Sequence, residues 1–153
     1  MSLWTIALAA ALGAACRYGL DFHLSARTGG RLPWGTFAVN VSGSLALGLL
    51  AGGVLFLGVP AEWRLALGTG FLGAYTTFST WMMETLRLLQ RGERAAAALN
   101  LAGSWAAGTA AAASGMALAF SVPCLRRRPS SGPQMQAKVP ASLYRGLNEG
   151  ELR

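Results

Sequence analysis

Four hydroxyl-bearing side chains crowd one short stretch, GAYTTFSTW at positions 73–81, and together they could bind an ion: Thr76, Thr77, Ser79 and Thr80. The surrounding segment 65–83 carries no formal charge and is long enough to cross a bilayer, where unpaired polar groups are unfavourable. One or two such hydroxyls would simply bond back to the preceding helical turn. Four of them beside Gly73 favour an unwound segment, whose free carbonyls or amides would face an ion.

A second polar face is predicted on the segment 34–48, WGTFAVNVSGSLALG. Thr36, Asn40 and Ser44 recur there at helical spacing, and an asparagine inside a membrane helix is unfavourable unless it is hydrogen-bonded. The alternative interpretation is a packing face, because the same face continues into the small residue Gly48. Both interpretations can hold at opposite ends of the face. A later segment repeats the pattern with Asn100, Ser104, Gly108 and Ala112.

Charged side chains are scarce near these polar side chains. Arg17, in GAACRYGLDF, could extend to the membrane interface and pair with Asp21 four residues on, or could draw anions into a vestibule. Acidic residues are nearly absent from the helix centres, which argues against a carboxylate relay for protons or cations. The remaining donors are hydroxyls, amides and aromatic ring edges. Each hydrogen bond to an anion returns only about 1.5–3 kcal/mol against a much larger dehydration cost, so an anion path needs a ladder of donors.

The composition predicts one all-α integral membrane domain that must position these groups. The 153 residues are 53% hydrophobic and only 12% charged. Stretches with few or no charges occupy four ranges: 3–24, 33–60, 65–83 and 95–125. Because a spanning helix needs roughly 20 apolar residues, we expect four transmembrane helices joined by short loops, with a break in the third.

The four-helix domain is expected over residues 1–122, followed by a basic tail over 123–153. The tail mixes Pro, Ser, Gly, Gln and charge without helical periodicity, so we expect it to be mostly disordered. Its arginines at 126–128 directly follow a membrane helix, which favours anionic lipid headgroups over nucleic acid as their partner. The sequence contains no nucleophile–base pair or metal-ligand cluster, so we expect no enzymatic activity.

The positive-inside rule gives no preferred orientation for four helices. One side of the membrane would receive Arg27, Arg31, Arg87, Arg91 and Arg94. The other side would receive Arg64, Arg126, Arg127, Arg128 and Lys138. A short chain gives poor statistics, but this balance favours a protein that inserts in both orientations and pairs antiparallel with itself.

Three motifs in this order, GAACRYGLD (13–21), WGTFAVNVSGS (34–44) and GFLGAYTTFSTWMMET (70–85), resemble the Fluc/CrcB fluoride channel family. The resemblance covers residues 1–122. It implies a dual-topology antiparallel homodimer in the cell membrane, with two pores that carry fluoride out of the cell passively. Composition and spacing alone lead only to a membrane protein with a polar, neutral path.

The resemblance also implies roles for single residues. Backbone carbonyls of Gly73 and Thr76 would hold a structural Na⁺ at the dimer centre, and Arg17 would lie at a vestibule. Trp81 stands where the family has a second phenylalanine, and it could offer a ring edge and an indole N–H. The fluoride pore as a whole would be lined by Thr36, Asn40, Thr77, Phe78, Trp81 and Ser104.

Two other functions stay open at the level of sequence. A small four-helix drug exporter can also have dual topology, but it needs a membrane-embedded carboxylate, and Asp21 lies near the end of its helix, one turn from Arg17. A helper subunit would only pack against other membrane proteins through its small-residue faces. Such a subunit would need no break in the third helix.

Overall fold

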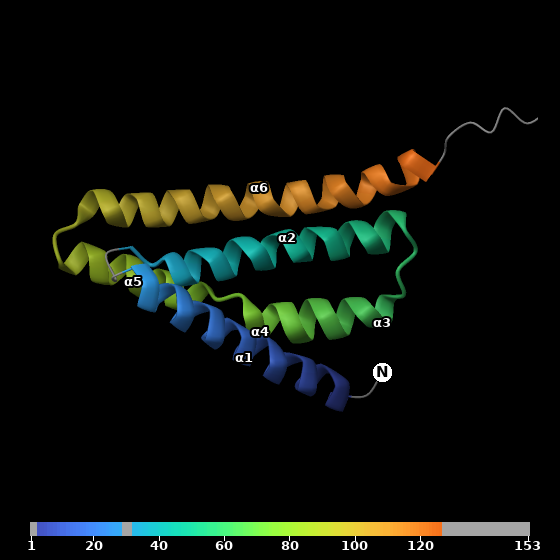
Figure 1. The fold of residues 1–153 in the computed structure, drawn as a ribbon, viewed down its shortest axis with the longest axis horizontal. Helices are drawn as coiled ribbons and strands as arrows, with labels where there is room; N and C mark the ends of the chain where they lie inside the picture. The colour runs from blue at the N-terminus through green and yellow to red at the C-terminus, as the bar shows by residue number, and fades with distance from the viewer. Residues whose placement is uncertain (1–2, 29–31, 127–153) are drawn as a thin grey trace, which may run out of the picture.

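The computed structural model describes residues 3–28 and 32–126, and every regular element in those ranges is helical. The segments run alternately back and forth along one long axis (Figure 1). In chain order they are α1 (Leu3–Thr28), α2 (Trp34–Phe56), α3 (Ala61–Trp63), the π-helix η1 (Arg64–Leu72), α4 (Gly73–Tyr75), α5 (Phe78–Gln90) and α6 (Arg94–Arg126).

Three continuous helices, α1, α2 and α6, are long and apolar enough to cross a membrane. The third of the four predicted segments differs, because it is divided among α3, η1, α4 and α5. None of these pieces reaches the roughly 20 residues that a span requires. Crossing by these pieces together therefore stays a prediction. The predicted tail begins inside α6, which continues past position 122 to Arg126, and the rest of that tail lies outside the described residues.

Glycines allow α2 and α6 to pack with their backbones in close contact. A Cβ added at Gly48 would collide with the Ala112 carbonyl, and one at Gly52 would press on the Ala119 side chain. The approach is reciprocal, because a Cβ at Gly115 of α6 would collide with the Leu45 carbonyl of α2. Small residues at the crossing permit this proximity in membrane helices. The packing interpretation is thus confirmed for this end of the α2 face.

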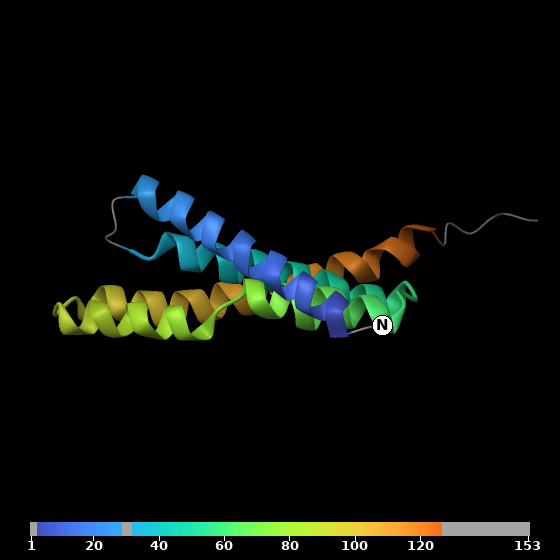
Figure 2. The same cartoon turned by 90° about the horizontal axis from the view of Figure 1, so that it is seen from below.

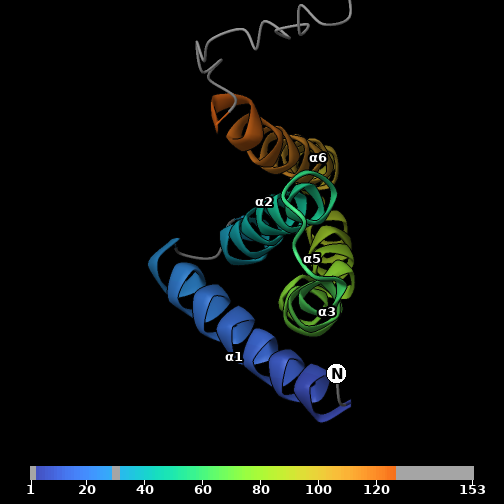
Figure 3. The ribbon, with the colours of Figure 1, turned by 90° about the vertical axis from the view of Figure 1, so that its right-hand side faces the viewer.

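Helix α1 crosses the other side of the bundle at an angle, as Figures 2 and 3 show. Seen along the long axis, α1 and α6 lie on opposite sides of α2 and the α3–α5 segments (Figure 3). Gly13 makes the α1 crossing possible, because a Cβ there would overlap the Phe71 carbonyl of η1. Gly70 plays the same role from the η1 side, against the Ile6 carbonyl.

Large apolar side chains face outward, and few are buried. Val39 is the one large side chain that is fully buried among the described residues. By contrast Trp4 is 79% exposed, Phe78 70% and Trp105 68%. A surface of this kind would be unfavourable in water and is matched to lipid or to another apolar protein surface.

Candidate functional site

The third segment is interrupted at Thr76 and Thr77, which both have extended backbone. Their φ and ψ angles are −77° and 156° for Thr76, and −146° and 123° for Thr77. The thin connection between α4 and α5 is visible in Figures 1 and 2. Gly73 does not open the unwound stretch, because it is helical with φ −63° and ψ −34°. The extended residues therefore begin three positions after this glycine.

Asn40 of α2 holds the extended residues in place through a pair of hydrogen bonds with one peptide group. Its Nδ2 donates to the Thr77 carbonyl at 2.9 Å, and its Oδ1 accepts from the Thr77 N–H at 2.9 Å. A side-chain amide thus satisfies both polar groups of a residue that has left the helix. Asn40 is thus hydrogen-bonded between two segments, as predicted, because an unpaired side-chain amide is unfavourable in an apolar environment.

The interruption redirects two backbone N–H groups away from the carbonyls that would accept them in a continuous helix. The Thr77 N–H would bond the Gly73 carbonyl in a continuous helix, but it donates to Asn40 instead. The Thr80 N–H would bond the Thr76 carbonyl, but it donates to the Thr77 hydroxyl at 3.3 Å. Thr77 is thereby the N-cap of α5. The carbonyls of Gly73 and Thr76 are thus left without the donors that an unbroken helix would supply.

The four hydroxyls divide between the two interpretations of the sequence. Thr76 bonds back to the Leu72 carbonyl at 3.0 Å, as the plainer interpretation expects. The Thr77 hydroxyl instead lies 3.0 Å from the Thr80 hydroxyl and 3.4 Å from the Ser79 hydroxyl. These three groups cluster at the N-terminus of α5, where an α-helix leaves amide donors unpaired.

A cavity of about 310 Å³, here called the central cavity, lies beside this cluster. Its lining brings together five of the six predicted pore residues: Asn40, Thr77, Phe78, Trp81 and Ser104. The rings of Phe78 and Trp81 meet edge to face, with centroids 5.6 Å apart and planes at 84°. No charged side chain of the described residues lines this cavity, so the polar side chains that line it are neutral: hydroxyls, an amide and two indoles.

Thr36 and Arg17 line a separate cavity of about 210 Å³, here called the Arg17 cavity. Thr77 lines both cavities and therefore lies between them. The Thr36 hydroxyl donates to Glu84 Oε1 at 2.8 Å. The predicted pairing of Arg17 with Asp21 is not formed in the described structure, where Asp21 accepts a hydrogen bond from the Ser25 hydroxyl at 3.3 Å. Arg17 is thus a cation beside a polar cavity without that partner.

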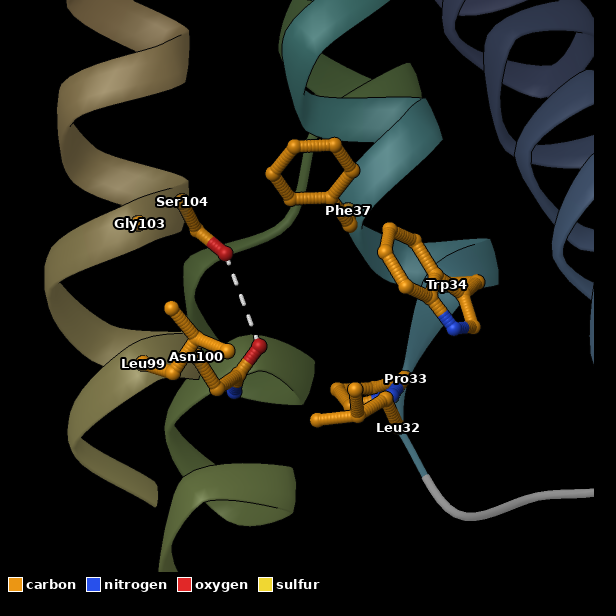
Figure 4. A pocket seen from close by; sticks show the side chains of 8 residues that line it. All are labelled: Leu32, Pro33, Trp34, Phe37, Leu99, Asn100, Gly103 and Ser104. Carbon is orange, nitrogen blue, oxygen red and sulfur yellow. Dashed lines mark hydrogen bonds between the residues drawn. The ribbon is translucent and has the colours of Figure 1, made fainter. Parts of the chain in front are cut away.

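A hydrogen-bond network that the residue types did not predict joins α5 to α6. The Trp81 indole N–H donates to the Asn100 main-chain carbonyl at 3.0 Å, and the Asn100 amide donates to the Thr85 hydroxyl at 2.8 Å. Figure 4 shows Asn100 and Ser104 beside a third cavity of about 220 Å³, with a 3.5 Å bond from Ser104 to the Asn100 Oδ1. The available signal was the position of Asn100, one turn before Ser104. Its main-chain role could not be read from residue types.

Comparisons with known proteins identify the family. A family model described as "CrcB-like protein, Camphor Resistance (CrcB)" matches residues 4–116. A protein of Symbiobacterium thermophilum named "Fluoride-specific ion channel FluC 1" is 48% identical over 122 residues, covering 78% of this chain and 98% of that protein. The "Fluoride-specific ion channel FluC" of Methylobacterium nodulans is 48% identical over 71% of this chain and 88% of its own length.

A third relative, the "Fluoride-specific ion channel FluC" of Acidobacterium capsulatum, is 47% identical over 74% of this chain and 91% of its own length. These relatives are named as channels, and a channel is not an enzyme. The three apolar helices and the family together make this chain a multi-pass protein of the cell membrane. It belongs to the CrcB-like family.

Proposed function

We propose that this chain is a fluoride-selective channel through which fluoride leaves the cell passively, relieving fluoride toxicity. The observation that carries the proposal is the central cavity, where neutral donors and three aromatic side chains surround a space that no charged side chain of the described residues lines. The names of the relatives supply the identity of the ion.

The lining chemistry suits a small, strongly hydrated anion. Asn40 uses one of its two amide hydrogens on Thr77, so the other is available to an ion. The hydroxyl of Thr77 and the positive edges of Phe78 and Trp81 extend this set of donors. Neutral donors each replace part of the hydration shell without binding the anion so strongly that it cannot leave.

The two rival functions have less support. A proton-coupled drug exporter needs an acidic residue within the path, but none of the described acidic residues lines the central cavity. Asp21 lines the Arg17 cavity and is bonded to Ser25. A helper subunit that acts only by packing gives no reason for the paired bonds by which Asn40 holds Thr77 extended.

An antiparallel homodimer with two pores is the assembly that we propose. Phe78 and Trp105 line the central cavity yet remain 70% and 68% exposed in the single chain. A second copy would cover these rings and close the cavity against lipid. Equal numbers of basic residues on the two predicted sides support insertion in both orientations. In this arrangement α3, η1, α4 and α5 cross the membrane together as one interrupted segment.

We further propose that the carbonyls of Gly73 and Thr76 hold a structural Na⁺. Both carbonyls lose their helical donors at the interruption, and the carbonyls of unwound membrane helices are typical Na⁺ ligands. Two copies would supply twice as many oxygens as one chain. The described residues contain no cluster of His, Cys, Asp or Glu that would hold a metal, so the donor set is backbone oxygen. The ion would stabilise the dimer.

Sodium withdrawal tests the ion and the dimer together. Replacing Na⁺ by N-methylglucamine should lower the melting temperature of the purified protein and release monomer, because binding to the folded dimer alone stabilises it by mass action. The measurement is thermal unfolding with light scattering, with K⁺ substitution as a control for ionic strength. A dimer equally stable in Na⁺ and in N-methylglucamine would contradict the sodium site. A monomer in Na⁺ would contradict the assembly.

Fluoride efflux from liposomes tests the function. Vesicles loaded with potassium fluoride and containing only this purified chain should empty rapidly when valinomycin is added, as read by a fluoride electrode. Vesicles loaded with potassium chloride should retain their anion. If the wild-type chain and Trp81→Phe both fail to release fluoride while remaining folded, the proposed function is wrong for this chain acting alone. Efflux from Trp81→Phe only would assign the block to the indole.

A further inference from the structure

Trp81, Thr85 and Asn100 form a closed ring of three hydrogen bonds between α5 and α6. The indole N–H of Trp81 donates to the Asn100 carbonyl at 3.0 Å. The Asn100 Nδ2 donates to the Thr85 hydroxyl at 2.8 Å, and that hydroxyl donates to the Trp81 carbonyl at 2.9 Å. Each residue thus bonds to both others, and the ring includes the side chain and the backbone of Trp81.

The ring is buried where Thr85 and Asn100 contribute to it. Thr85 is 7% exposed and Asn100 is 6% exposed, so water cannot readily replace a lost bond. A main-chain carbonyl has two lone pairs. The Asn100 carbonyl can therefore accept a hydrogen bond from the indole N–H and another from a backbone N–H of α6. Ser104 adds a bond to the Asn100 Oδ1 at 3.5 Å, which leaves the amide nitrogen directed at Thr85. The orientation of the Asn100 side chain is therefore specified from two sides.

The indole N–H of Trp81 is consequently hydrogen-bonded to α6 and is not available to an ion. Trp81 also lines the central cavity, so the part of it that an anion can meet there is the carbon edge of its ring. That edge carries partial positive charge and is a weaker, less directional donor than the N–H. Phe78 packs edge to face with Trp81, and its orientation depends on where the indole is held.

We propose that Thr85 is the positioning residue for Trp81, acting through its bonds with the Asn100 amide and the Trp81 carbonyl to fix the indole so that its ring edge faces the anion path. The expected effect on fluoride efflux rests on the proposed channel function. The expected effect on the position of the indole does not. A ring left free to rotate would either narrow the path or offer its N–H as a trap for the anion. Asn100 and Thr85 themselves need not touch the ion.

The purified full-length chain, labelled with ¹⁵N-tryptophan in detergent micelles, tests the positioning directly. The indole resonance of Trp81 is assigned by its absence in Trp81→Phe. Thr85→Val should shift that resonance upfield and speed the exchange of its proton. Thr85→Ser, which keeps the hydroxyl, should leave the chemical shift and the exchange rate close to those of the wild-type chain. Thr28→Val is the matched control, because Thr28 makes the same kind of bond to a carbonyl one turn back, outside the ring. An unchanged indole resonance in folded Thr85→Val would overturn the proposal.

A double-mutant cycle in the fluoride efflux assay tests the consequence for transport. Thr85→Val should slow efflux about tenfold when residue 81 is tryptophan, the equivalent of one lost buried hydrogen bond. In the Trp81→Phe background, which has no indole N–H to position, the same change should slow efflux less than about twofold. Equal losses in both backgrounds would show that Thr85 only joins the helices. Failure of all variants to conduct would count against the proposed function, while the indole resonance still decides the positioning.

Discussion

Fluoride efflux should be lost when Asn40 is replaced by aspartate. The substitution removes the Nδ2 that donates to the Thr77 carbonyl at 2.9 Å and puts a carboxylate oxygen against that carbonyl. It also places a negative charge on a cavity whose lining is otherwise uncharged among the described residues. Repulsion of the entering anion and the loss of a half-buried bond act in the same direction. We expect efflux to fall by more than about 100-fold, which corresponds to roughly 3 kcal/mol.

The comparison with Asn40→Leu separates the two causes. Leucine has the same branched arrangement of side-chain heavy atoms as asparagine and removes both bonds to Thr77 without adding charge. It should leave more efflux than aspartate does, because it does not repel the ion. The assay is the fluoride electrode measurement on vesicles, with size-exclusion profiles to show that each variant is folded. Normal efflux through a folded Asn40→Asp variant would remove Asn40 from the pore.

Residue types along the chain predicted the polar faces of the helices better than they predicted the hydrogen-bond partners of those polar side chains. The spacing of Thr36, Asn40 and Ser44 indicated one helical face, and the structure divides that face between two cavities on either side of Thr77. The Asn40–Thr77 pair joins residues 37 positions apart. Local periodicity carries no information about such a contact, because it depends on how two helices are placed side by side.

The limits of sequence reasoning are clearest in the third segment. Glycine beside threonines indicated a break, but Gly73 is helical and the extended residues are Thr76 and Thr77. Their conformation is held by an amide on another helix, and not by the conformational freedom of glycine. The π-helical turn η1 was also not foreseen, since i→i+5 bonding has no residue signature and results from local packing. For Trp81, the indole N–H that the resemblance offered to an anion is already bonded to α6.

The second large effect concerns the seam between α2 and α6. Gly48→Val should destabilise the folded protein by about 3 kcal/mol, at the upper end of the range for overpacking. A Cβ at this position collides with the Ala112 carbonyl, which is backbone and cannot rotate away. Relief requires the two helices to separate, and Gly115 lies against the Leu45 carbonyl on the same seam. The gain in helix propensity from glycine to valine is only a few tenths of a kcal/mol and cannot offset this.

Gly19→Val is the matched control, because a Cβ at Gly19 meets nothing within 4 Å in the chain. Its effect should stay within about 0.5 kcal/mol, as for surface substitutions in general. Reversible unfolding of the two variants in mixed micelles, followed by circular dichroism, compares them directly. Equal stability would mean that the α2–α6 contact tolerates a wider spacing than the glycines indicate. A selective loss for Gly48→Val would show that the fold depends on backbone proximity between α2 and α6. Ser44 of α2 and Ser104 of α6 line the same cavity, so the spacing that the small residues permit between these helices also bears on the dimensions of the polar path.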